Sequence, residues 1–184
     1  MSKSILLSIR PQWVEKILNE QKTIEVRKQF PKDYVGWVYL YCSKATKSNE
    51  RLLGNHKDNY RYHTTNDHID FYSDYMLRNI VNGKVVARFY CDNVEEITIE
   101  KWSPSKEQDL LKASCLTENQ LFDYCNLESG KPFYAIHISK LEIFDEPKEL
   151  SEFYRKYDQH DYSPVYYMPI TKAPQNYCYI EGEE

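Results

Sequence analysis

Two polar strand faces, close together in the chain, constrain this sequence more than any other feature. An apolar run at residues 5–9 is followed by a helical segment at 11–20 and then by the alternating stretch 22–28. Successive side chains of a strand point to opposite faces, so each of the two strands gathers its polar residues on one face. These residues are Ser8, Arg10, Thr23, Glu25 and Arg27. If the two faces meet, a carboxylate, guanidinium groups and hydroxyls converge on one small surface.

That surface has two interpretations. Glu25 and Arg27 stand at alternate positions and would pair with each other, as a structural ion pair on a solvated outer face. In a partly buried cleft, the guanidinium of Arg27 would instead read a phosphate or a base edge. Glu25 would then accept a hydrogen bond from an exocyclic amine. The alternation alone does not choose between the two.

Short strands dominate the rest of the chain, and most are joined by segments without helical periodicity. Strands are predicted at 37–42, 84–92, 133–144 and 176–180, and helices at 71–81, 105–113, 117–125 and 149–157. Thr117 followed by Gln120 predicts a capping box, and Asn19 is the best candidate for a left-handed residue after the first helix. This order favours an α+β fold, a small mixed β-barrel surrounded by short helices, over a doubly wound parallel sheet.

A polar segment at about 44–80 interrupts the pattern and is interpreted as an insertion into a single domain of residues 1–184. Its Tyr60-Arg61-Tyr62 run suits either stacking on bases or a solvated surface, and we favour the surface. The histidines and aspartates of the segment match no metal-binding spacing, so no metal site is predicted. They are His56, His63, Asp67, His68 and Asp70.

Composition places the chain among soluble globular proteins. No apolar run has the length of a membrane helix, and the N-terminus lacks a signal-peptide core, so a cytoplasmic location and no membrane partner are expected. The five cysteines are scattered, and Cys42 and Cys91 fall in apolar strands as small core residues. The net charge is −4, yet residues 1–63 hold 12 Lys and Arg against 6 Asp and Glu. A basic N-terminal third on an acidic protein is typical of one face that meets an anionic partner.

Several of these stretches together resemble the ASCH domain, a family of the PUA-like superfamily. They are Leu7-Ser8-Ile9-Arg10-Pro11, Ile17-Leu18, Lys22-Thr23-Ile24-Glu25-Val26-Arg27-Lys28, Asn82-Gly83-Lys84-Val85-Val86, and Phe133-Tyr134-Ala135-Ile136-His137-Ile138-Ser139. The tail, residues 173–179, is similar to small ASCH proteins of phage and prophage type. The resemblance covers most of the chain outside 44–80 and 100–128.

The resemblance implies a barrel with a charged cleft that binds RNA, other nucleic acid or a nucleotide-like ligand. By position, Lys22, Glu25 and Arg27 would line this cleft, with Ser8 and Arg10 beside them. Alternation from Thr23 puts Lys22 on the opposite face. Lys22 therefore reaches the cleft only if it still belongs to the turn before the strand.

Some small ASCH proteins hydrolyse acylated cytidine with a Lys, a Thr and a Glu. The Lys of that set matches Lys22, but the position of its Thr is filled by Glu25. Thr23 lies two residues away, on the same predicted face. Glu20 also replaces the usual Gly of the turn. These departures weaken the expectation of hydrolase activity more than the expectation of the fold.

Three functional hypotheses follow, and no cofactor is predicted from the sequence. The first is a binding module for single-stranded RNA, other nucleic acid or a nucleotide, with Ser8, Arg10, Lys22, Thr23, Glu25 and Arg27 as ligand-binding residues. The second is an enzyme, either an amidohydrolase of N-acylated cytidine or a metal-dependent ribonuclease, with Lys22 and Glu25 as catalytic residues and Glu95 as a possible assistant to Lys22. The third is a phage-type inhibitor that contacts a protein partner through 44–80.

Overall fold

The computed structural model describes residues 3–44, 50–54, 60–63, 80–98, 103–157 and 166–182. Its main element is a five-stranded sheet with the strand order β12-β1-β3-β6-β9. The strands are β1 (Lys3–Ile9), β3 (Gly36–Cys42), β6 (Val85–Cys91), β9 (Ser139–Lys148) and β12 (Tyr177–Glu181). β1 and β3 run parallel, and the other neighbours are antiparallel. The parallel pair is connected through helix α1 (Pro11–Leu18) and strand β2 (Ile24–Arg27).

The central strand β3 is covered on both faces, as its two-sided apolar pattern predicts. Val38, Leu40 and Cys42 pack into the main core together with the buried face of α1. Tyr39 and Tyr41 point the other way, into a second buried cluster. β3 is thus shielded from water by a cluster on each face, and the parallel β1 pairs along its edge.

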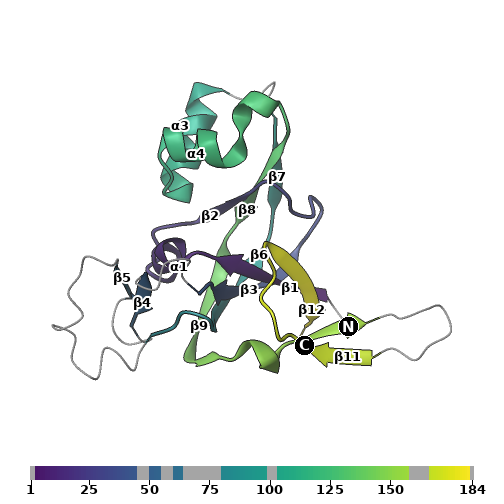
Figure 1. Ribbon diagram of the computed structural model, residues 1–184. Helices are drawn as coiled ribbons and strands as arrows, with labels where there is room; N and C mark the ends of the chain where they lie inside the picture. Colours follow the sequence, from purple (N-terminus) through teal and green to yellow (C-terminus); the bar gives the residue numbers. More distant parts are fainter. Residues whose placement is uncertain are drawn as a thin grey trace.

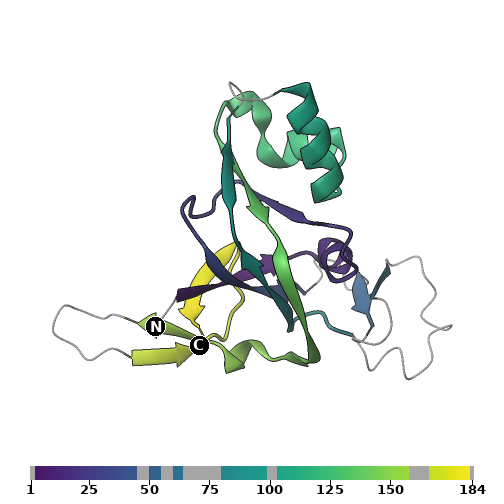
Figure 2. The ribbon, with the colours of Figure 1, turned by 180° about the vertical axis from the view of Figure 1, so that it is seen from behind.

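A second, three-stranded sheet carries the polar strand of the N-terminal motif. Its order is β2-β8-β7, with β8 (Phe133–His137) and β7 (Val94–Ile97), and both pairs are antiparallel. Figures 1 and 2 show α3 (Pro104–Ser114) and α4 (Glu118–Cys125) at this end of the molecule, followed by the short turn η3 (Leu127–Ser129). Leu110 and Leu121 bury the helices against the sheet.

The predicted capping box of α4 is confirmed: the hydroxyl of Thr117 accepts from the amide of Gln120, and the Gln120 side chain accepts from the amide of Thr117. Only some of the apolar side chains of this helix face the sheet. Leu121 and Cys125 are buried, whereas Phe122 and Tyr124 are exposed. Only two of the four side chains on an eight-residue helix face the small sheet.

The polar segment 44–80 is described only in part. β4 (Arg51–Leu53) and β5 (Arg61–His63) pair as a small hairpin and contact α1. The preference for a solvated surface at Tyr60 is wrong, since this side chain is 3% exposed and packs in the main core. Most of the predicted helix at 71–81 lies outside the described residues, as do the side chains of His56, Asp67, His68 and Asp70.

Two predictions for the C-terminal part need correction. The long strand at 133–144 is two strands, β8 and β9, separated at Ile138. The helix predicted at 149–157 is only the turn η4 (Leu150–Glu152), and the chain then enters β10 (Tyr154–Tyr157), which pairs with β11 (Tyr166–Pro169). The final edge strand is confirmed as β12, antiparallel to β1.

The predicted α+β class is confirmed by this mixture of sheets and short helices. Cys42 and Cys91 are buried in strands, as expected for small core residues. None of the described helices has the length and apolar character needed to cross a membrane.

Candidate functional site

Three charged side chains of the N-terminal motif form a buried cluster, which we call the charged cluster. The Nζ of Lys22 lies 3.3 Å from the carboxylate of Glu25, and a terminal nitrogen of Arg27 lies 3.1 Å from the other oxygen of that carboxylate. Lys22 and Glu25 are only 3% and 5% exposed. One carboxylate therefore faces two cations, and the cluster carries an excess of one positive charge.

The turn after α1 brings Lys22 to this cluster. Glu20 adopts a left-handed conformation with φ 57°. The amides of Gln21 and Lys22 both donate back to the carbonyl oxygen of Lys16, which closes the turn. β2 begins only at Ile24, so Lys22 belongs to the turn and its side chain is not bound by the strand alternation. The left-handed residue was predicted one position too early, at Asn19, whose φ is −94°.

Hydrogen bonds fix the two cations further. The Nζ of Lys22 donates to the carbonyl oxygen of Ser114 at 2.6 Å and lies 5.5 Å from the ring centre of Trp13. Arg27 donates to the carbonyl oxygen of Ser8 at 2.7 Å, which links β2 to β1 across the polar faces. The hydroxyl of Ser8 is itself occupied, because it donates to the carbonyl oxygen of Pro174 at 2.7 Å.

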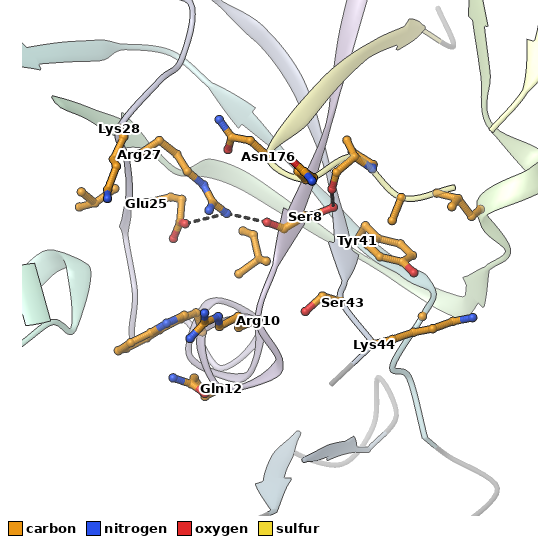
Figure 3. Close-up of a pocket in the computed structure, with 18 of the residues that line it drawn as sticks. Ser8, Arg10, Gln12, Glu25, Arg27, Lys28, Tyr41, Ser43, Lys44 and Asn176 are labelled. Atoms are coloured by element: carbon orange, nitrogen blue, oxygen red, sulfur yellow. Dashed lines mark hydrogen bonds and ion pairs between the residues drawn. The ribbon is translucent and has the colours of Figure 1, made fainter. Parts of the chain in front are cut away.

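The charged cluster borders a cavity of about 1520 Å³, hereafter the pocket. Figure 3 shows Arg27 and Glu25 from β2 on one side, Ser8 from β1 in the middle, and Tyr41, Ser43 and Lys44 on the other side. Residues 170–176, just before β12, close a further wall. Burial raises the pKa of the Tyr41 hydroxyl above its ordinary value, so this group stays a neutral donor at physiological pH.

Cations outnumber carboxylates in the lining of the pocket by six to three. The cations are Arg10, Lys22, Arg27, Lys28, Lys44 and Lys172, and the acids are Glu25, Asp123 and Glu149. Since the whole chain has a net charge of −4, this excess is a local feature of the pocket. A cavity lined by charge of one sign raises the local concentration of ligands of the opposite sign.

The structure brings most of the predicted site residues together. Ser8, Arg10, Lys22, Glu25 and Arg27 all line the pocket. Thr23 does not: its backbone joins Ala113 and Ile138 through hydrogen bonds, and its side chain is exposed elsewhere. Glu95, proposed to assist Lys22, also lies outside the pocket lining and forms an exposed pair with Lys106 at 3.6 Å.

Several lining residues were missed by the sequence analysis. Trp13 is half-buried, packs against the main core and also lines the pocket. Lys28 lies 5.3 Å from the ring centre of Tyr124, and both line the pocket. Asn176 comes from the far end of the chain and donates to the carbonyl oxygen of Gln29 at 2.8 Å. Of these residues, only Lys28 could have been predicted from the sequence, because it ends the stretch 22–28. The other residues reach the pocket through the tertiary fold.

The pocket offers donors and rings rather than metal ligands. Over the described parts of the chain, no three His, Cys, Asp or Glu side chains converge in a way that would hold a metal ion. The pocket instead combines exposed cations, the amides of Gln12, Gln29 and Asn176, and the aromatic rings of Trp13 and Tyr124. Such groups bind phosphates, base edges and base faces.

Solved structures with a similar fold include an ASCH protein from Zymomonas mobilis. Its crystal structure has a TM-score of 0.57 and 13% sequence identity, over 97% of this chain and 87% of that chain. A tyrosine-to-phenylalanine mutant of that protein gives a TM-score of 0.57 and 12% identity, over 98% of this chain and 91% of that chain. A serine-to-alanine mutant of the same protein also gives a TM-score of 0.57, with 13% identity over 97% of this chain and 88% of that chain.

No protein-family profile and no curated protein matches this sequence. The structural likeness spans nearly the whole chain, so it shows the fold although few residues are identical. The predicted likeness to the fold of an ASCH domain is thereby confirmed. The resemblance to phage and prophage members stays a prediction.

Proposed function

We propose that this chain, which has the fold of an ASCH domain, is a binding module for single-stranded nucleic acid, with RNA as the leading candidate, or for a nucleotide. The observation that carries the proposal is the excess of cations in the pocket, six against three carboxylates, on a protein that is acidic overall. An anionic ligand is the partner that such a pocket attracts. The volume of about 1520 Å³ exceeds that of an ordinary small-molecule site and suits a ligand with several nucleotides.

The exposed cations at the rim of the pocket would bind the phosphate groups. Arg10, Lys28, Lys44 and Lys172 are all exposed and line the pocket. Within the described parts of the chain, none of these four forms an ion pair with a carboxylate. Their charges are therefore available to phosphate groups, which supply most of the affinity of nucleic-acid binding.

The aromatic rings and side-chain amides that line the pocket would recognise the bases. Trp13 and Tyr124 present aromatic rings at the pocket wall, and a base has a planar face that stacks on such rings. Gln12 and Gln29 supply side-chain amides, each with a donor and an acceptor for a base edge.

The charged cluster supports binding rather than hydrolysis. The nitrogen of Lys22 donates to the carbonyl oxygen of Ser114 and pairs with the carboxylate of Glu25, so the structure holds it in place through two acceptors. Glu25 occupies the position of the hydroxyl in the hydrolysing relatives and is held by two cations. We therefore expect no turnover of N-acylated cytidine or of labelled RNA, with or without divalent metal.

Fluorescence anisotropy with labelled single-stranded RNA, single-stranded DNA and a nucleotide tests the proposal. The variants Lys28→Glu and Lys172→Glu reverse charges in the pocket, and Lys131→Glu reverses an exposed charge outside it. We expect each pocket variant to weaken binding roughly tenfold at low salt, because a phosphate contact is replaced by repulsion. The control variant should bind like the wild type. Equal losses in all three variants, or no binding of any probe by the wild type, would overturn the proposal.

A further inference from the structure

A two-stranded ribbon of exposed tyrosines projects from the body of the protein at the end opposite α3 and α4 (Figures 1 and 2). It consists of the described strands β10 and β11, and we call it the tyrosine ribbon. All eight of its residues are exposed. Four tyrosines and one methionine have exposed fractions of 41–53%: Tyr154, Tyr157, Tyr166, Tyr167 and Met168. Large rings exposed together on a monomer mark an interaction surface.

The register gives both faces of the ribbon the same composition. Directly paired residues of an antiparallel ladder share a face. One face therefore holds Tyr154 and Tyr167 with Lys156 and Pro169, and the other holds Tyr157 and Tyr166 with Arg155 and Met168. Each face combines two tyrosines with one cation. Neither of the two strands contains an acidic residue.

The ribbon is continuous with the wall of the pocket. Leu150 and Ser151, which line the pocket, precede β10 by only a few residues. β11 leads directly into residues 170–176, which also line the pocket and include the cation Lys172. Phe153 and Ile170 anchor this base, because both are buried in the second core cluster. A ligand that leaves the pocket on this side meets the tyrosine ribbon next.

We infer that the tyrosine ribbon is a stacking platform for the part of a single-stranded nucleic acid that extends beyond the pocket. This inference rests on the proposed function of the pocket and adds a second contact surface for the same strand. Bases stack on the tyrosine rings of the ribbon, while the cations between them face the phosphates. Each strand of the ribbon spans roughly 10 Å, which adds room for further nucleotides that a mononucleotide in the pocket does not reach.

The composition of the ribbon favours a nucleic acid over a protein partner. The centre of a protein interface is apolar and closely packed, with few charges. Here Met168 is the only aliphatic side chain besides Pro169, and every other position is a tyrosine or a cation. Tyrosine combines a planar face with a polar tip, and alternation with cations is the arrangement that tracks a single strand without reading its sequence.

Ligands of different length distinguish binding in the pocket from binding on the ribbon, because only a long ligand reaches both. The probes are uridine 5′-monophosphate and fluorescent oligouridylates of four and twelve nucleotides, measured by anisotropy and competition. The variants Tyr154→Val with Tyr167→Val, and Tyr157→Val with Tyr166→Val, remove the rings and keep β-branched residues suited to a strand. Matching double Tyr→Phe variants keep the rings. Phe122→Ala removes a ring of similar exposure from α4, at the other end of the molecule.

We expect the wild type to bind the twelve-nucleotide probe at least tenfold more tightly than the four-nucleotide probe. Each Val double variant should weaken binding of the longer probe roughly tenfold for every stacked base that is lost, and should bind the monophosphate like the wild type. The Phe variants and Phe122→Ala should bind the longer probe normally.

Two results would overturn the inference in distinguishable ways. If the Val variants bind the twelve-nucleotide probe as tightly as the wild type while Lys28→Glu does not, the pocket stands and the ribbon serves another partner. If the wild type binds neither the monophosphate nor either oligonucleotide, the proposed function of the pocket fails together with the ribbon.

Discussion

The charged cluster and the tyrosine ribbon both contain two cations, but the cluster holds them against a buried carboxylate and the ribbon exposes them. In the cluster, Lys22 and Arg27 share one buried carboxylate, and contacts from β1 and α3 fix their positions. In the ribbon, Arg155 and Lys156 stand between exposed tyrosines on a strand pair whose base is anchored in the second core cluster and whose strand β10 contacts β12. The cluster is part of the folded core, and the ribbon is an addition to it.

This difference in burial predicts that the charged cluster contributes mainly to stability and the ribbon mainly to ligand binding. A buried charge that loses its partner is strongly destabilising, so the residues of the cluster cannot change without affecting the fold. Exposed side chains contribute little to stability, so a substitution among them acts mainly on the binding of a ligand. Substitutions in the cluster should therefore act mainly on unfolding, and substitutions in the ribbon or at the pocket rim mainly on affinity.

The largest expected effect on stability is that of Glu25→Gln. The change keeps the shape of the side chain but leaves the buried Lys22 and the half-buried Arg27 without their shared carboxylate. We expect a loss of about 3 kcal/mol in the free energy of unfolding, measured by urea titration. Glu142→Gln is the matched control, because Glu142 pairs with Arg88 at 2.7 Å with its own side chain 48% exposed. An exposed pair contributes only about 0–1 kcal/mol. Similar losses in both variants would contradict the assigned role of the cluster.

Glu20→Gly should have a smaller effect in the opposite direction. Glu20 is exposed and has φ 57°, a conformation that glycine adopts without the steric cost of a Cβ atom. We expect a gain of about 1 kcal/mol in the free energy of unfolding, visible as a higher urea midpoint. Glu20→Ala also removes the carboxylate but keeps the Cβ atom, so it should not reproduce the gain. An equal gain from alanine would mean that charge, and not backbone strain, limits this turn.

The smallest effect on stability is expected for the ribbon. Replacing Tyr154 and Tyr167 by alanine should change the free energy of unfolding by no more than about 0.5 kcal/mol for each residue. Phe153→Ala, one residue before Tyr154, should cost about 3 kcal/mol because Phe153 is buried at the base of the ribbon. A large loss for the tyrosine variants, measured by thermal unfolding, would show that the ribbon packs against the body and is not a free surface.

The alternation of polar and apolar residues was enough to predict the N-terminal half of the site. It placed Ser8, Glu25 and Arg27 on facing strands, because each strand has one face in the core and a one-residue slip would bury charges. Lys22 escaped this rule, since a left-handed residue at Glu20 extends the turn to residue 23. Glu25 forms the predicted ion pair with Arg27, but the pair lines the pocket and does not lie on a solvated outer face; the reading of a base by Glu25 stays a prediction.

The C-terminal half of the site could not be predicted in the same way. Residues 149–157 have apolar positions at helical spacing, but Phe153 alone is fully buried there, and tertiary pairing with β11 overrides the local preference. Tyr124 and Asn176 reach the pocket from α4 and from the segment before β12, and no spacing in the sequence connects them to residues 22–28. Contacts between distant segments depend on the assembled sheets.

The central claim is that the cations at the rim of the pocket hold the phosphates of a single strand. The most direct test of this claim is the salt dependence of RNA binding. For single-stranded nucleic acid, log Kd changes with log salt concentration in proportion to the number of neutralised phosphates, about 0.7 for each. Replacing both Lys28 and Lys172 by alanine should reduce this slope by about 1.4, whereas the Tyr→Val variants of the ribbon should weaken binding without changing it. A slope that stays the same after loss of the two lysines would contradict phosphate binding in the pocket.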